Sequence, residues 1–230
     1  MPATSDWPRQ GLPGFFNSEP IEEKENNQIL VAKQPISGLN HMTLGYELLF
    51  RNSSENRAII DDPDLATARV IVNSFMEIGL DKIVGPSLAF INVTREFILG
   101  NHCKWLPADR VVFEILEDAV PDLELVNALT AMSSLGYRFA LDDFDFSPQM
   151  RPLIPFCDFV KVDLRAVQRA NLEEQLKSLE NVKLVAEKVE TLEEYDFCKR
   201  AGFDYFQGYY FGKPHIVCGT KIPAVAGQKR

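Results

Sequence analysis

The sequence predicts an α/β fold, a (β/α)8 TIM-like barrel with an irregular antiparallel first strand. Eight short β-rich runs lie between residues 29 and 211, and helical patterns separate most of them. From residue 89 onward the runs recur at intervals of about 20 to 30 residues, the spacing of strand–crossover–strand units. Eight parallel strands joined by such crossovers close into a barrel, so the number of runs and their spacing indicate the same architecture.

Each expected strand is a short run dominated by apolar residues. In chain order the runs are 29–36, 43–50, 89–94, 111–117, 138–144, 159–164, 183–189 and 205–211. Only six residues separate the first run from the second, which is too few for a crossover helix. We therefore expect these two strands to pair as an antiparallel hairpin.

Four expected helices lie between the later strands. Residues 66–80 and 166–180 show helical patterns. The segment 121–136 should end at Gly136, and its apolar stripe consists of residues three apart: Leu123, Val126, Leu129, Met132 and Leu135. Thr191 and Glu194 form a capping box that opens a helix ending at Gly202. That last helix should pack Leu192, Tyr195 and Cys198.

Length and composition predict one domain. A chain of 230 residues that is 46% hydrophobic can build its own core. We expect a flexible leader at 1–27, the barrel at 28–223 and a tail at 224–230. No run reaches the roughly 18 apolar residues that span a bilayer, and no basic-then-apolar segment opens the chain, which predicts a cytoplasmic protein.

The charge and the cysteines exclude several classes of function. The chain has 24 Lys and Arg against 33 Asp and Glu, a net charge of −9, so DNA and anionic membrane surfaces are not expected partners. The four cysteines show no CxxC spacing, which argues against a zinc site or a redox pair and predicts reduced thiols.

Almost every expected strand contains a charged or amide residue flanked by apolar ones. In order these are Gln34, Glu47, Asn92, Glu114, Asp142 with Asp143, Lys161, Glu187 and Gln207. Any single one of them is explained by a strand end that caps a helix or faces solvent. Because barrel strands deliver their carboxyl ends to one rim, the whole set indicates convergence on a common pocket.

Crowded carboxylates repel one another unless cations neutralise them. Oxygen ligands favour hard divalent ions such as Mg²⁺ or Mn²⁺, and the adjacent Asp142 and Asp143 suit a pair of ions. Two such ions would clamp the attacking and leaving oxygens of a phosphoryl displacement, with Lys161 holding a water or stabilising charge at phosphorus. The alternative for Lys161 is an ion pair with Asp163 or a neighbouring carboxylate. The pattern predicts a metal-dependent phosphodiesterase-like barrel.

The motifs resemble those of the EAL-domain family, bacterial signalling phosphodiesterases that linearise cyclic di-GMP. YELLFR (46–51) matches the family's Glu-x-Leu-x-Arg signature. Seven further segments match in the same order, and they are QPI (34–36), INVT (91–94), FEILE (113–117), LDDF (141–144), KVD (161–163), AEKVE (186–190) and FQGYYFGKP (206–214).

The resemblance implies a role for each matched residue. Metal ligation would fall to Glu47, Asn92, Glu114 and Asp142, with a second ion at Asp143. Lys161 and Glu187 would handle the attacking water. Contacts with cyclic di-GMP would come from Gln34, Arg51, Gln207 and Pro214.

Three departures from the family pattern accompany these matches. DFDFSPQM (143–150) lacks the glycines of the family's loop, with Asp145 in place of the first glycine. Leu116 replaces a threonine, and Lys188 replaces the glycine of Ala-Glu-Gly-Val-Glu. Altered supporting residues commonly cost 10- to 100-fold in metal affinity or activity. The same variants look like the subgroup in which an EAL domain precedes an HDOD domain, where activity is often weak or absent.

The sequence therefore leaves two main functions open. The first is metal-dependent hydrolysis of cyclic di-GMP to linear pGpG. The alternative is a degenerate domain that acts as a non-catalytic cyclic di-GMP receptor or protein-interaction module. A barrel acting on another phosphate ester does not account for Arg51, Gln207 and Pro214 together. A homodimer or a signalling-protein partner is compatible with either main function.

Overall fold

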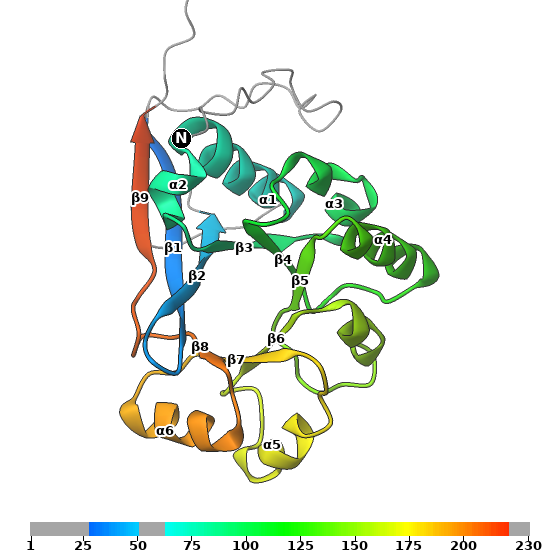
Figure 1. Cartoon of the computed structure of the whole chain (residues 1–230), viewed down its shortest axis with the longest axis vertical. Helices are drawn as coiled ribbons and strands as arrows, with labels where there is room; N and C mark the ends of the chain where they lie inside the picture. The colour runs from blue at the N-terminus through cyan, green and yellow to red at the C-terminus, as the bar shows by residue number, and fades with distance from the viewer. Residues whose placement is uncertain (1–27, 51–62, 221–230) are drawn as a thin grey trace, which may run out of the picture.

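A computed structural model of the chain describes residues 28–50 and 63–220. Seven strands run parallel around a ring: β2 (Thr43–Phe50), β3 (Leu88–Val93), β4 (Val111–Ile115), β5 (Arg138–Leu141), β6 (Phe159–Asp163), β7 (Lys183–Glu187) and β8 (Tyr205–Phe206). β1 (Gln28–Gly38) pairs antiparallel with both β2 and β8 and closes the ring. The predicted eight-stranded barrel with an antiparallel first strand is confirmed (Figure 1).

The strands occupy the predicted positions, although β4, β5 and β7 end two or three residues earlier than predicted. Two larger differences lie in the C-terminal part of the chain. The last barrel strand covers only Tyr205–Phe206, because the chain turns at Gln207 and Gly208 instead of continuing to 211. The sequence prediction also missed β9 (His215–Thr220), which pairs antiparallel with β1 outside the barrel (Figure 1).

Helices connect the strands and cover the outside of the ring (Figure 1). The segment between β2 and β3 contains α1 (Pro63–Ile71), the π-helix η1 (Val72–Ile78) and α2 (Leu80–Val84). Further along are α3 (Arg95–Leu99), α4 (Leu123–Ser134), α5 (Arg169–Leu176) and α6 (Leu192–Ala201). Two 3-10 helices complete the set, η2 (His102–Trp105) and η3 (Arg151–Phe156).

The predicted buried stripe of α4 was partly wrong. Leu129 and Met132 are buried as expected, but Leu125 completes the buried face while Leu123 and Leu135 are exposed. Residues spaced strictly by three drift around a helix of 3.6 residues per turn, whereas the 125–129–132 spacing stays on one side. Leu192 of α6 is likewise exposed, and Tyr195 and Cys198 are buried.

The capping predictions agree with the structure more closely. The Thr191 hydroxyl accepts a hydrogen bond from the Glu194 N–H at 3.2 Å. The Glu194 carboxylate accepts one from the Glu190 N–H at 2.8 Å, one residue before the cap. Gly202 ends α6 with a φ of 102°, a left-handed conformation that glycine adopts without penalty.

The core has two layers. The main cluster lies between the strands and the surrounding helices. A smaller cluster fills the barrel interior with Ile36, Phe90, Val112, Ala140, Phe159 and Val185. Because side chains alternate across a strand, each of these residues shares its face with a polar residue two positions away. The apolar layer therefore forms a floor beneath a polar layer.

Three of the four cysteines are buried and the fourth, Cys218, is exposed. All four are free thiols, as the sequence predicted. In residues 28–50 and 63–220, no helix is long and apolar enough to cross a lipid bilayer. The predicted leader at 1–27 and tail at 224–230 lie outside the described residues.

Candidate active site

Polar side chains from all eight barrel strands meet above the apolar floor. They follow from the two-residue period: Asn92 lies two residues after Phe90, Glu114 after Val112, and Lys161 after Phe159. The antiparallel β1 reverses the order, so Gln34 precedes Ile36 and pairs in register with Glu47 of β2. The barrel thus places in one layer residues that are up to 173 positions apart in the sequence.

Lys161 lies at the centre of this layer and is almost fully buried. Its ammonium is 2.6 Å from Glu114 Oε1, 2.7 Å from Asp142 Oδ1 and 3.0 Å from Glu187 Oε1. Glu47 Oε2 is further away, at 3.8 Å. The ion-pair alternative for Lys161 therefore describes the structure, but with these four carboxylates and not with Asp163.

Amide side chains hold Glu47 on the other side. Asn92 Nδ2 donates to Glu47 Oε1 at 3.0 Å, and Gln207 Nε2 donates to Glu47 Oε2 at 2.5 Å. The same Gln207 nitrogen lies 3.2 Å from Gln34 Oε1. Gln34 in turn donates to the Gly212 carbonyl at 3.1 Å, which links β1 to the loop after β8. These bonds orient the Glu47 carboxylate toward the cluster.

Burial dominates the electrostatics of the cluster. It raises the pKa of Glu114 well above its usual range, although the charge of Lys161 acts in the opposite direction. It also raises the pKa of Glu187, to about 8. Burial by itself would lower the pKa of Lys161, but Asp142 and the other surrounding carboxylates raise it well above its usual range. Four carboxyl groups thus surround one ammonium, and the raised pKa values of Glu114 and Glu187 reflect the cost of ionising all four together.

The donor atoms of the cluster fit a divalent cation. Asn92 Oδ1, Glu187 Oε2 and Glu114 Oε2 are buried without a hydrogen bond, and Glu114 Oε1 contacts only the Lys161 ammonium, at 2.6 Å. Buried oxygens of this kind suit Mg²⁺ or Mn²⁺. No group of three or more His, Cys, Asp or Glu side chains in the described parts of the chain is already arranged around a common metal position. Because the Lys161 ammonium already contacts Glu114, Asp142 and Glu187, a bound ion would compete with it for their oxygens.

A cavity of about 370 Å³ opens above the cluster. Of the residues predicted for the site, it is lined by Gln34, Glu47, Asp142, Asp143, Glu187, Gln207 and Pro214. Arg51, the remaining predicted substrate contact, lies outside the described residues. Asn92, Glu114 and Lys161 are joined to the lining residues by the contacts given above.

The mouth of the cavity contains residues that the sequence did not single out for the site. Lys188 is one of them, and its ammonium lies 3.7 Å from the carboxylate of the predicted residue Asp143. Lys188 also donates to Asp163. Arg165 and Glu190 form an ion pair in the same lining. Asp163 was detectable, because it lies two residues after Lys161 on the same strand face.

The loop at 143–150 does not close over the cluster. None of residues 144–150 lines the cavity, and Phe144 and Phe146 are buried in the main hydrophobic core. Asp143 and Phe146 have positive φ angles, 42° and 66°, so the loop adopts left-handed conformations without glycine. Asp145 is exposed and accepts a hydrogen bond from the Ser147 N–H at 2.9 Å.

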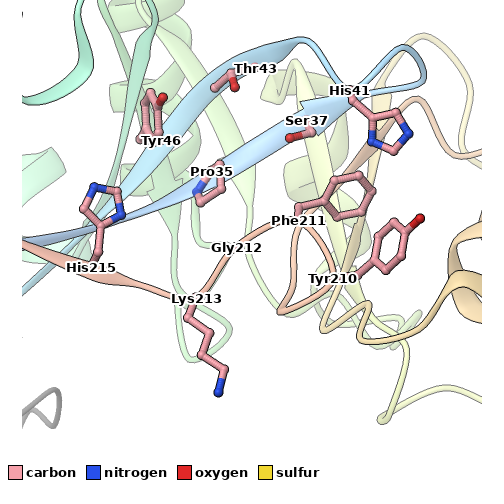
Figure 2. A pocket seen from close by; sticks show the side chains of 10 residues that line it. All are labelled: Pro35, Ser37, His41, Thr43, Tyr46, Tyr210, Phe211, Gly212, Lys213 and His215. Atoms are coloured by element: carbon pink, nitrogen blue, oxygen red, sulfur yellow. The ribbon is translucent and has the colours of Figure 1, made fainter.

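A second, larger hollow of about 670 Å³ lies beside the β1–β2 hairpin (Figure 2). His41 packs against Tyr210 and Phe211 at one side of it, with the ring centroids of His41 and Phe211 5.6 Å apart. None of its lining residues is acidic. It therefore offers no carboxylate ligands for a cation, and the candidate active site is the smaller cavity.

Known proteins resemble this chain in sequence and in fold. It is 38% identical over 192 residues to the cyclic di-GMP phosphodiesterase CdgJ of Vibrio cholerae, a match covering 81% of this chain and 44% of CdgJ. A standalone versatile EAL protein from Vibrio cholerae O395, solved in a c-di-GMP-bound form, has a TM-score of 0.61 at 27% identity, covering 80% of this chain and 91% of that one. This chain thus spans less than half the length of CdgJ.

Klebsiella pneumoniae BlrP1, solved as a complex with manganese and cyclic di-GMP, shares the fold with a TM-score of 0.68 at 21% identity, over 89% of this chain and 60% of that one. The profile of the EAL domain family matches residues 93–214, more than half of the sequence. That range includes the strands carrying Glu114, Lys161 and Glu187, whose side chains meet beneath the cavity. The motif resemblance is therefore confirmed, and the chain belongs to the EAL-domain family.

Proposed function

We propose that this chain is a metal-dependent phosphodiesterase that hydrolyses cyclic di-GMP to linear pGpG. The supporting observation is the buried set of oxygens without hydrogen bonds at the base of a 370 Å³ cavity. The names of the relatives support the choice of substrate, since CdgJ is named a cyclic di-GMP phosphodiesterase and two of the similar solved structures contain the dinucleotide.

Four residues of the polar layer would hold the metal ion. Glu47, Asn92, Glu114 and Asp142 would hold a Mg²⁺ or Mn²⁺ ion, and each contributes a side-chain oxygen in the polar layer. Such an ion supplies a Lewis acid that polarises the phosphodiester and acidifies a bound water.

Glu187 and Lys161 act on the water and on developing charge. Glu187 Oε2 has no hydrogen-bond partner, and a pKa of about 8 places this group near the range of an effective proton acceptor. Lys161 stays protonated among its carboxylates, so it orients them and stabilises negative charge and does not act as a base. Glu187 would take a proton from the water as its oxygen bonds to phosphorus, one ester P–O bond would break, and the leaving oxygen would take a proton from solvent water.

The dinucleotide would contact the rest of the cavity lining. Gln34, Gln207 and Pro214 line the opening, and Arg51 is proposed to bind the substrate on the basis of the matched motif alone. Cavities of this size suit small ligands, and only part of a bound cyclic di-GMP molecule would lie inside this one. A homodimer and a signalling-protein partner stay predictions.

A non-catalytic cyclic di-GMP receptor is the second candidate. Two observations favour it: Lys188 forms ion pairs at the mouth of the cavity, and Lys161 already contacts the carboxylates that would hold an ion. Both candidates bind the dinucleotide, so turnover is the property that separates them.

Incubating the purified chain with cyclic di-GMP and Mn²⁺, and following pGpG by chromatography, tests the proposal. We expect pGpG to accumulate, and Glu47→Ala to slow its formation by about 100-fold or more, because the substitution removes an oxygen ligand. Glu124→Ala is the matched control, since Glu124 is exposed on α4 and pairs with Arg95. Binding measured by calorimetry without product formation would establish the receptor function instead.

A further inference from the structure

The candidate site contains two lysines, and each has its own set of carboxylates. Lys161 lies among Glu47, Glu114, Asp142 and Glu187 in the buried layer. Lys188 lies at the mouth and pairs with Asp143 and Asp163, where it donates a hydrogen bond to Asp163. The two sets share no carboxylate, although Asp142 and Asp143 are neighbours in sequence. The mouth of the cavity thus contains a cation that belongs to the protein itself.

The backbone at Lys188 is held in an unusual conformation by its neighbours. Its φ is +57°, in the left-handed region that side-chain-bearing residues seldom adopt. On one side the Glu187 carbonyl accepts from Leu164 N–H at 3.4 Å, and on the other the Val189 N–H donates to the Gln207 carbonyl at 3.0 Å. Glycine would fit this turn without strain, so a lysine here adopts a backbone conformation that is unfavourable for any residue with a side chain.

The ammonium of Lys188 lies where a second cation would bind. Asp143 is half exposed and lines the cavity, whereas Asp163 is largely buried and reaches the same lysine from beneath it. A divalent ion held by Asp143 would have to displace the lysine or lie within a few ångströms of its positive charge. Repulsion between a divalent ion and an ammonium at such a short distance would strongly disfavour binding both, because the Coulomb energy varies inversely with their separation.

We propose that Lys188 supplies the positive charge at Asp143 and Asp163 in place of a second divalent ion, so that this chain binds one divalent ion where its carboxylates would otherwise admit two. The inference rests on the proposed function for the first ion, held by the Glu47–Asn92–Glu114–Asp142 set. It concerns how many ions bind and can be tested without substrate.

The test is the number of Mn²⁺ ions bound per chain, measured by calorimetry and by the loss of the free Mn²⁺ signal in electron paramagnetic resonance. We expect one ion in the parent protein and two in Lys188→Gly and Lys188→Met. Lys188→Arg retains the positive charge and should bind one. Lys183→Met is the matched control, because Lys183 begins β7, the strand that Lys188 directly follows, but pairs with Asp204 outside the site. This variant too should bind one ion.

Two ions in the parent protein would overturn the inference, and so would one ion or none in both Lys188→Gly and Lys188→Met. If only the glycine variant gained an ion, bulk and not charge would limit the site, and the proposal would be wrong. Hydrolysis plays no part in these counts. A parent chain that binds one ion without hydrolysing cyclic di-GMP would therefore contradict the proposed function and leave this inference standing.

Discussion

Glu114 and Lys161 are the most deeply buried charged side chains of the candidate site, with 0% and 1% of their surfaces exposed. Each would be costly to bury alone, because an ion loses its hydration in the interior. Their 2.6 Å contact offsets part of that cost, but Glu114 Oε2 has no hydrogen-bond partner. An unpaired buried oxygen of this kind supports the proposal that Glu114 holds a metal ion.

Gly208 has a structural role beside this cluster. It follows Gln207 directly, has a φ of 151°, and its α-carbon lies so close to Val189 that an added Cβ would meet the backbone N and O of that residue. The close approach allows the Val189 N–H to donate to the Gln207 carbonyl. A side chain at 208 would separate the loops that hold Gln207 and Lys188 at the cavity.

We expect Gly208→Ala to lower the free energy of unfolding by about 3 kcal/mol or more, because it combines an unfavourable φ with a backbone clash. Gly136→Ala is the control: its φ of 87° is also positive, but an added Cβ would meet nothing within 4 Å. That substitution should cost only about 1 kcal/mol. Urea denaturation of the two variants checks the difference, and equal losses would contradict the role given to the Val189 contact.

At the scale of elements, the β1–β2 hairpin explains how the first two polar positions reach the site. Antiparallel pairing puts Gln34 opposite Glu47, so a strand running against the other seven still delivers its amide to the shared layer.

Specific side chains define where several helices begin. Three of the described helices have a side-chain cap at their amino terminus, from Thr94, Asp122 and Thr191. These caps fix where each helix begins relative to the strand before it.

We expect Thr191→Ala to destabilise the protein by about 1 kcal/mol, because the Glu194 N–H loses its acceptor. For a chain of this size that corresponds to a fall in Tm of about 2 to 4 °C. Thr191→Ser retains the hydroxyl and should melt close to the parent protein. Thermal denaturation followed by circular dichroism distinguishes the variants, and a serine variant as unstable as the alanine variant would argue against the cap.

At the scale of the whole molecule, part of the net charge of −9 comes from acidic residues gathered at one site. Four acidic residues line one cavity, and they are Glu47, Asp142, Asp143 and Glu187. Glu114 and Asp163 lie next to them, paired with Lys161 and Lys188, and two lysines only partly balance these six carboxyl groups. Such a concentration of like charge stores repulsion in the folded state, and a divalent cation would relieve it. The folded protein should therefore be more stable with metal than without.

We expect saturating Mn²⁺ to raise the Tm, by about 5 to 10 °C at a free concentration near 100 times Kd. Glu114→Gln should fold without metal, since glutamine matches the buried side chain in shape and has no charge, but it should lose most of the rise. Glu124→Gln, an exposed change on α4, should retain the rise. Differential scanning calorimetry with Mn²⁺ and with EDTA measures both, and an undiminished rise in Glu114→Gln would exclude that carboxylate as a ligand.

The sequence by itself determined the barrel, the antiparallel first strand and most of the residues that meet in the cavity. It could do so because strand periodicity and the order of βα units are local properties, and a barrel brings the same end of every strand to one rim. The burial pattern of α4 and the added strand β9 were not accessible in this way, because both depend on what each segment packs against.

Only the tertiary structure decided which carboxylates pair with Lys161 and which pair with Lys188. The sequence placed Asp142 and Asp143 together as ligands for a pair of ions, yet in the fold the first faces Lys161 and the second faces Lys188. Lys188 directly follows β7, and Asp143 lies in the loop after β5. Nothing in the spacing of these two residues along the sequence predicts their contact. Ion pairs between distant segments depend on distances of a few ångströms in space, which the closure of the barrel sets and the linear sequence does not encode locally.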